Sequence, residues 1–138
     1  MIVADTGAIL ALLNADDRHH QVVRLMYEST GSQWVLPWAV LPEVDYLLAT
    51  RIGARAQRIW LDDLSSGAFA VAWGTEADLL RARAIDKRHA ALRLGLVDTC
   101  VMAMAERMRA SAIVTVDRRH FGAVTLTPPV PLLPQLSY

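Results

Sequence analysis

The stretch Met1-Ile2-Val3-Ala4-Asp5-Thr6-Gly7 predicts how the chain begins to fold. Its apolar run is typical of a buried strand in a parallel sheet that is covered on both faces. Asp5 follows at the carboxyl end of that strand, and Thr6 is suited to cap a helix that starts at Gly7. Ligands of open α/β sheets bind at this edge. Asp5 taken alone therefore has two interpretations, a helix cap or a functional acid.

Length and composition indicate a globular protein of 138 residues, which we expect to form a single domain over residues 1–138. Hydrophobic residues make up 54% of the chain and the formal net charge is zero, so a contact with nucleic acid needs a local basic patch. Cys100 is the only cysteine, which excludes an internal disulfide and favours a reducing compartment. We find no signal peptide and no apolar run long enough to span a membrane, so a soluble cytoplasmic protein is expected.

Apolar runs alternate with helical patterns along the chain, which predicts an α/β fold. We expect a three-layer α/β/α sandwich with a central parallel sheet of four to five strands. The expected strands after the first are 33–36, 68–73 and 112–116, with a short edge strand at 124–126. The expected helices are 7–13, 18–29, 40–50, 54–64, 96–109, and one that Thr75 and Asp78 open with a helix-start box and that runs to about residue 91. The tail at 128–131 is expected to be extended and polyproline-like.

Four acids lie where this fold brings them to one edge of the sheet. Asp5 and Asp117 each follow an apolar strand directly. Asp98 lies in the first turn of a helix that is apolar almost all round, and Glu43 lies in the first turn of another. Because the helix after a parallel strand begins at the same edge, all four carboxylates can converge. The alternative is that each acid is a separate helix cap, and the convergence of four favours a shared site.

Clustered carboxylates repel one another and their pKa values rise unless positive charge compensates. We expect no lysine or histidine to do this, because His89 and His120 lie in charged stretches typical of exposed surface. A divalent cation is then the simplest compensation. An all-oxygen set of ligands favours Mg²⁺, with Mn²⁺ as the other candidate, over zinc. Two basic groups, at 51–58 and 81–93, are either solvated helix faces or contacts for a phosphate backbone.

Several short motifs, in their order and spacing, resemble the PIN-domain family, and specifically the VapC-type toxin ribonucleases of bacterial toxin–antitoxin pairs. The motifs are Val3-Ala4-Asp5-Thr6-Gly7, Asp17-Arg18-His19-His20, Leu41-Pro42-Glu43-Val44, Leu94-Gly95-Leu96-Val97-Asp98-Thr99, Ala105-Glu106-Arg107 and Ile113-Val114-Thr115-Val116-Asp117-Arg118-Arg119-His120-Phe121.

The resemblance implies a PIN-like nuclease domain that hydrolyses RNA phosphodiester bonds with Mg²⁺. It implies that Asp5, Glu43, Asp98 and Asp117 form the catalytic acidic quartet, and that Asp5, Asp98 and Asp117 hold the metal. Thr6 and Thr115 match hydroxyl positions that orient the carboxylates. A cognate antitoxin, an RNA substrate and a homodimer are implied in the same way.

Two other functions remain open from the residues. One is a receiver-like signalling domain, which also gathers acids around Mg²⁺ but needs an acid after a middle strand and a lysine after a late one. Here Trp73 ends the third expected strand and Lys87 lies inside a helix. The other is an RNA-binding protein without catalysis.

Overall fold

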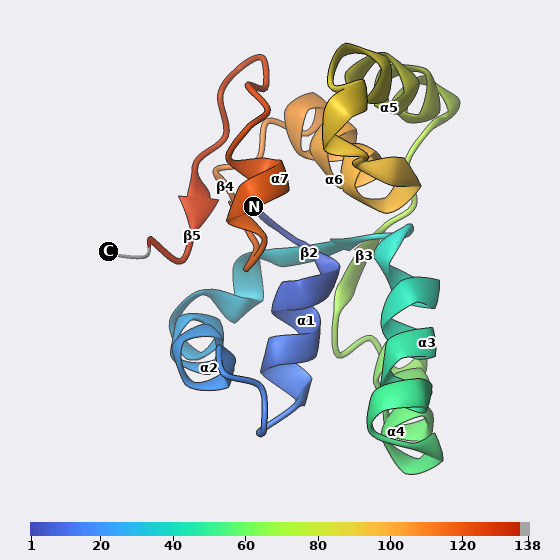
Figure 1. Ribbon diagram of the computed structural model, residues 1–138. Helices are drawn as coiled ribbons and strands as arrows, with labels where there is room; N and C mark the ends of the chain where they lie inside the picture. Colours follow the sequence, from blue (N-terminus) through green and yellow to red (C-terminus); the bar gives the residue numbers. More distant parts are fainter. Residues whose placement is uncertain (136–138) are drawn as a thin grey trace.

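The computed structural model describes residues 1–135, and one parallel sheet of five strands lies at its centre (Figure 1). The strands are β1 (Ile2–Ala4), β2 (Trp34–Pro37), β3 (Ala70–Ala72), β4 (Ala112–Val114) and β5 (Leu132–Leu133). Their spatial order is β3-β2-β1-β4-β5, and each neighbouring pair is parallel. The predicted parallel sheet is confirmed, and β1 and β4 lie side by side at its middle.

Helices cover both faces of the sheet, as the predicted three-layer sandwich requires (Figure 1). One layer holds α1 (Thr6–Leu13), α2 (His20–Thr30), α3 (Val40–Arg51) and α4 (Ala54–Ser66), and the other holds α5 (Glu76–Arg88), α6 (Gly95–Arg107) and α7 (Arg118–Phe121). Short 3₁₀ turns at Gly31–Gln33 and Ala90–Leu92 complete the connections. The predicted helices are found with ends shifted by a few residues, whereas α7 was not predicted. No helix within residues 1–135 combines the length and apolarity needed to cross a membrane.

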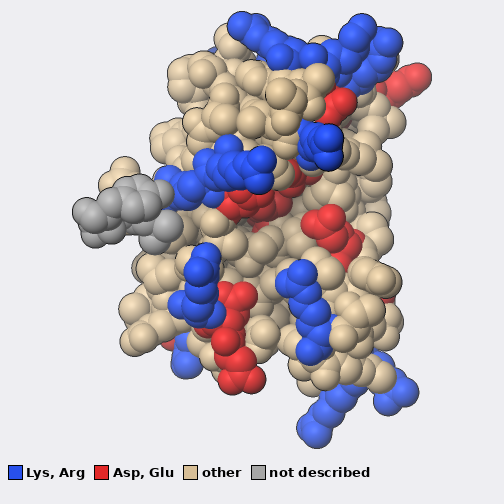
Figure 2. All heavy atoms as spheres, viewed as in Figure 1, with Lys and Arg blue, Asp and Glu red and all other residues tan. Residues whose placement is uncertain are grey.

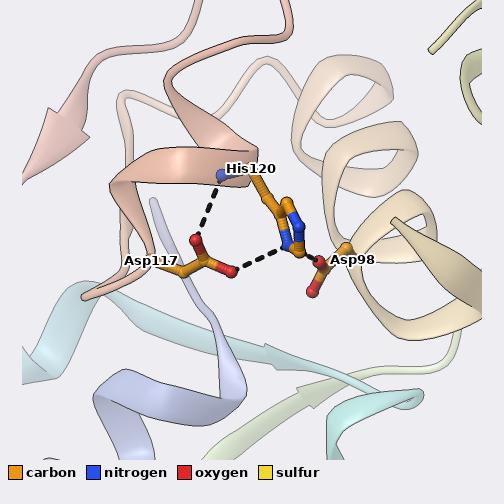
Figure 3. Close-up of side chains that lie close together, drawn as sticks. All are labelled: Asp98, Asp117 and His120. Carbon is orange, nitrogen blue, oxygen red and sulfur yellow. Dashed lines mark hydrogen bonds and ion pairs between the residues drawn. The ribbon is translucent and has the colours of Figure 1, made fainter. Parts of the chain in front are cut away.

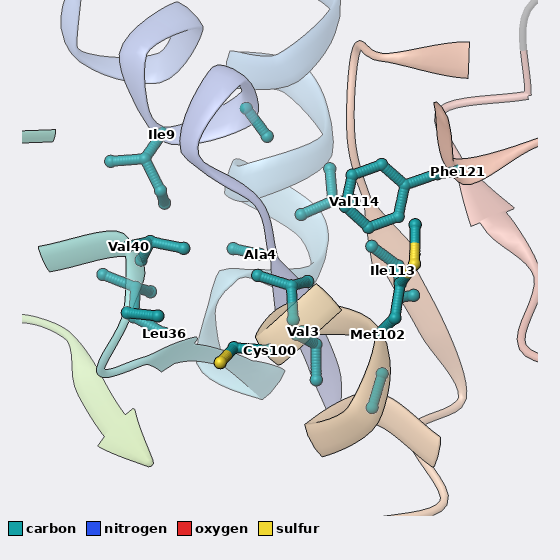
Figure 4. Packing of buried hydrophobic residues seen from close by; sticks show 14 of the residues in the cluster. Val3, Ala4, Ile9, Leu36, Val40, Cys100, Met102, Ile113, Val114 and Phe121 are labelled. Carbon is teal, nitrogen blue, oxygen red and sulfur yellow. The ribbon is translucent and has the colours of Figure 1, made fainter. Parts of the chain in front are cut away.

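The core lies on both faces of β1, which explains why that strand is apolar without alternation. Val3 and Ala4 are fully buried. Figure 4 shows Ile9 of α1 and Val40 of α3 on one side of the strand and Cys100 of α6 on the other. The middle of α6 is buried all round, as its sequence predicts.

Gly7 allows α1 to begin close to the neighbouring strand. A Cβ atom at this position would come within 2.8 Å of Cγ2 of Val116, just beyond β4. At the same place the backbone N–H of Asp5 donates to the carbonyl oxygen of Val114 over 3.0 Å. The missing side chain therefore lets Asp5 remain paired with β4 while the chain turns into a helix.

The fifth strand lies in a different segment from the one predicted. Residues 124–126 form no strand, because Leu126 packs into the core and the N–H of Thr127 donates to Glu106 Oε2 at 2.9 Å. Instead, Leu132–Leu133 pairs with β4, directly after the segment 128–131 that is predicted to be extended. An edge strand needs partners on one side only, so the prolines of this tail do not prevent pairing.

Arginine–carboxylate pairs join α5 and α6. Asp78 is 2% exposed and closes the predicted capping box with Thr75 at the start of α5. Its carboxylate also accepts two hydrogen bonds from Arg107 of α6, at 2.7 and 3.0 Å. Burial alone would raise the pKa of the Asp78 carboxyl, but the bonds from Arg107 and the Thr75 backbone outweigh it, so the pKa lies below its ordinary value.

We predict that Asp78→Ala destabilises the protein by about 2 kcal/mol, because Arg107 and the first turn of α5 both lose a charged hydrogen-bond partner. Urea unfolding at pH 7 measures the change. Glu76→Ala is the matched control, since Glu76 is an exposed acid in the same helical turn. Equal destabilisation by the two variants would show that the buried network contributes nothing beyond the interaction of an acid with the helix dipole.

Candidate active site

Asp5 lies at the carboxyl end of β1, at the position that precedes α1. The helix begins at Thr6, so Asp5 and not Thr6 occupies the capping position, yet its carboxylate makes no capping hydrogen bond. Asp5 is 4% exposed, and its Oδ1 atom has no hydrogen-bond partner within residues 1–135. The Asp5 side chain therefore does not cap the helix.

A buried hydroxyl links Asp5 to the segment after β4. Thr115 Oγ1 donates to Asp5 Oδ2 over 3.0 Å and accepts from the backbone N–H of Asp117, also over 3.0 Å. Thr115 is fully buried. This side chain thus fixes the Asp5 carboxylate and the backbone of Asp117 relative to each other.

Asp98, Asp117 and His120 meet at the same edge (Figure 3). Asp98 comes from the first turn of α6, and Asp117 caps α7 by accepting from the His120 N–H over 3.1 Å. The His120 ring points back towards the Asp117 side chain. Its Nδ1 lies 3.0 Å from Oδ2 of Asp98 and 3.0 Å from Oδ2 of Asp117. We call Asp5, Asp98 and Asp117 the acidic cluster.

The expectation that His120 is a surface histidine and that no histidine reaches these acids is wrong. Its side chain is only 22% exposed and contacts two members of the acidic cluster. The sequence feature that could have indicated this contact is the position of His120 three residues after Asp117. In the first turn of a helix, that position faces back towards the capping side chain.

Unlike the other predicted site residues, Glu43 and Thr6 make no side-chain hydrogen bond at the site within the described residues. Glu43 lies half-buried in the first turn of α3, close enough that its charge raises the pKa of Asp98, but it makes no hydrogen bond with the acidic cluster among the described residues. Thr6 is buried beside Asp5, and its hydroxyl has no hydrogen-bond partner within residues 1–135. Of the two predicted hydroxyls, Thr115 is the one that contacts a carboxylate.

The acidic cluster carries more negative charge than its surroundings compensate. Burial, together with the charge of Asp98, raises the pKa of Asp5 to about 7. Burial and the charge of Asp117 also raise the pKa of Asp98, although His120 partly offsets this. Since burial and like charges both disfavour the ionised carboxylates, a cation bound here would be stabilised strongly.

The donor atoms fit a divalent metal ion. Asp5 Oδ1 is a buried carboxylate oxygen, and neither it nor the hydroxyl of the next residue, Thr6, has a hydrogen-bond partner within residues 1–135. Donor atoms of Asp98, Asp117 and His120 lie within 4.8 Å of one another. Carboxylate oxygens are the ligands that hard divalent cations take in proteins. The site is therefore compatible with metal binding.

Figure 2 shows acidic side chains in the middle of the face that Figure 1 presents, with lysine and arginine side chains above and below them. A chain without net charge thus presents side chains of both signs on this face. Such a surface offers positive charge for a polyanion around a site that attracts a metal.

Comparison with known proteins assigns the chain to a family. The PIN domain family profile matches residues 2–125. Ribonuclease VapC26 of Mycobacterium tuberculosis is 34% identical over 123 residues, which cover 89% of this chain and 91% of that protein.

Solved structures show the same fold. Mycobacterium tuberculosis VapC20, described as a Sarcin-Ricin loop cleaving toxin, has a TM-score of 0.81 at 24% identity, over 89% of this chain and 95% of that one. VapBC2 from Rickettsia felis, described as bound to a DNA fragment from its promoter, has a TM-score of 0.72 at 15% identity, over 96% of this chain and 97% of that one.

The raised pKa of Asp5 predicts how stability depends on pH. The unfolded chain loses this proton near the ordinary value of 3.8, whereas the folded chain holds it until about pH 7. The folded state binds more protons between these values, so the stability of the metal-free protein falls as the pH rises through this interval. We predict that Asp5→Asn reduces the fall between pH 5 and pH 8, by at most about 3 kcal/mol.

Urea unfolding in EDTA at pH 5 and pH 8 measures this effect. Asp62→Asn is the control, because Asp62 is an exposed acid of α4 outside the acidic cluster. An equal loss of stability in wild type and Asp5→Asn would contradict the assignment of the unfavourable charge to Asp5.

Proposed function

This chain belongs to the PIN-domain family, as a VapC-type ribonuclease, and we propose that it cleaves RNA at the acidic cluster with a bound divalent metal ion. It is a nuclease, a hydrolase that acts on RNA. The observation that carries the location of the site is the set of neighbouring carboxylates: buried Asp5 and partly buried Asp98, both with raised pKa values, and Asp117 beside them. Mg²⁺ and Mn²⁺ are the candidate ions, because the ligands are mainly oxygens.

The proposed roles follow from where each side chain lies. Asp5, Asp98 and Asp117 would hold the metal. A divalent ion in such a site supplies a Lewis acid for the phosphate and lowers the pKa of a bound water. Glu43, half-buried at the start of α3, is proposed to orient the attacking water and accept its proton. Thr115 would position Asp5 through its hydrogen bond, and Thr6 is proposed to support the same carboxylate.

The RNA backbone is proposed to contact basic side chains next to the acidic cluster. Arg93 directly precedes the segment that leads to Asp98, and Arg119 lies between Asp117 and His120; both are exposed. Arg81 is less available, because it donates two hydrogen bonds to Glu106 at 2.7 and 3.0 Å. A local group of arginines can bind a phosphate backbone even though the protein as a whole has no net positive charge.

A toxin of this type has protein partners, and we propose that this chain binds a cognate antitoxin, forms a homodimer and acts in the cytoplasm as one domain. A cavity of ≈ 260 Å³ between α5 and α6, bordered by Leu79 and Leu96, has no member of the acidic cluster in its lining. Leu79, Leu80 and Leu96 are large exposed apolar side chains. Such a surface is suited to contact with protein rather than to phosphate chemistry.

The alternative functions fit the structure less well. A receiver-like domain needs a lysine beside its acids, and the nitrogen-bearing side chain next to Asp98 and Asp117 is a histidine. A non-catalytic RNA-binding protein would not need buried carboxylates with raised pKa values. Titration of Mg²⁺ in an RNA cleavage assay separates this alternative from the nuclease.

We predict that Asp98→Asn and Asp117→Asn each reduce RNA cleavage at least about 100-fold, since each removes a charged ligand from the site. Cleavage is measured with ribosomal RNA, transfer RNA and messenger RNA, with Mg²⁺ or Mn²⁺ and with EDTA. Asp62→Asn is expected to cleave like wild type. Wild-type rates for both cluster variants would overturn the site, whereas no cleavage by the wild type would overturn the function.

We predict that Thr115→Val lowers kcat about 10- to 100-fold with little change in KM, because Asp5 and the backbone of Asp117 lose the hydroxyl that positions them. Thr115→Ser keeps the hydroxyl and is expected to retain most of the activity. Unchanged kcat in the Thr115→Val variant, at an unchanged melting temperature, would show that the hydroxyl has no positioning role.

A further inference from the structure

His120 points one ring nitrogen between two carboxylates of the acidic cluster. Nδ1 lies 3.0 Å from an oxygen of Asp98 and 3.0 Å from an oxygen of Asp117 (Figure 3). The backbone N–H of the same histidine donates to the other oxygen of Asp117, which fixes the start of α7 and with it the direction of the ring. These contacts hold the nitrogen between the two carboxylates.

The spacing of these atoms is also that of neighbouring ligands on one ion. For metal–ligand bonds of about 2.1 Å, adjacent octahedral ligands lie about 3 Å apart, which is the separation of Nδ1 from each carboxylate oxygen. Asp5 adds an independent observation, because its Oδ1 atom is buried and has no hydrogen-bond partner within residues 1–135. A cation held by Asp98 and Asp117 would therefore lie beside an oriented nitrogen, and the Asp5 carboxyl is close enough for the charges of Asp98 and Asp117 to raise its pKa.

We propose that His120 Nδ1 is a ligand of the metal, so that the site is a mixed oxygen and nitrogen site that favours a transition-metal ion such as Mn²⁺ over Mg²⁺. This inference rests on the proposed function only in that a divalent cation binds at the acidic cluster. Mg²⁺ takes oxygen ligands, whereas imidazole nitrogen is a ligand for first-row transition metals. His120 is thus proposed to select the metal.

The opposing explanation is that His120 only neutralises the carboxylates when no metal is bound. The two explanations predict opposite effects of removing the ring. A histidine that only neutralises the acids competes with the cation, so its loss would strengthen metal binding. A histidine that is a ligand contributes a bond, so its loss weakens the binding of Mn²⁺ and affects that of Mg²⁺ less.

The test compares wild type with His120→Asn, which puts an amide near the position of Nδ1. His89→Asn is the matched control, because His89 ends α5 and is not part of the group formed by Asp98, Asp117 and His120. Binding of Mn²⁺ and Mg²⁺ to the full chain is measured by calorimetry, and thermal melts without metal confirm that each variant is folded. Pulsed electron paramagnetic resonance of bound Mn²⁺ then detects a coordinated ¹⁴N nucleus.

The expected result is ¹⁴N coupling in wild type and in His89→Asn, and none in His120→Asn. We also expect His120→Asn to lose on the order of 10- to 100-fold in Mn²⁺ affinity, with a smaller loss for Mg²⁺. Bound Mn²⁺ without ¹⁴N coupling in wild type, or tighter Mn²⁺ binding by His120→Asn, would overturn the proposal and leave the nuclease function standing. Absence of any Mn²⁺ or Mg²⁺ binding to wild type would overturn both, and the wild-type spectrum decides the matter even if a variant fails to fold.

Discussion

The central physical constraint is the repulsion among carboxylates that the fold brings to one edge of its sheet. Asp5 is buried and Asp98 is partly buried, and the pKa values of both rise because the ionised forms lose hydration and face one another. This arrangement lowers the stability of the metal-free protein at neutral pH. A bound cation removes the same penalty, so metal affinity and the stability of the fold are linked through one set of atoms.

The surrounding elements hold the carboxylates in place despite their repulsion. Pairing of β1 with β4 brings Asp5 beside Thr115, whose hydroxyl joins it to the backbone of Asp117. Gly7 permits the close start of α1 beside Val116. The site is thus built on β1 and β4, whose residues are all buried, so its geometry is supported by the core of the sheet.

The sequence predicted the sheet and most of the helices because hydrophobic patterns carry that information locally. It also placed Asp5, Asp98 and Asp117 at one edge, since each follows a strand or opens a helix. It did not predict β5, because a strand made of two leucines between prolines has no pattern of its own and depends on pairing with β4. His120 was missed because its environment depends on α7, a helix of four residues that is too short to leave a periodic signal.

Acids elsewhere in this chain are paired with arginines, whereas within residues 1–135 those of the acidic cluster are not. The uncompensated charge is therefore specific to the site and does not come from a shortage of basic residues. Asp78 and Glu106 have arginine partners, Arg107 and Arg81, and the pKa values of both acids lie below their ordinary range despite the opposing effect of burial on Asp78. The chain has 14 lysines and arginines in all. Among the residues that the structure describes, none of them forms an ion pair with the acidic cluster. Because an arginine paired with the cluster would neutralise it permanently, the lack of such a pair among the described residues keeps the carboxylates free for a cation that can bind and leave.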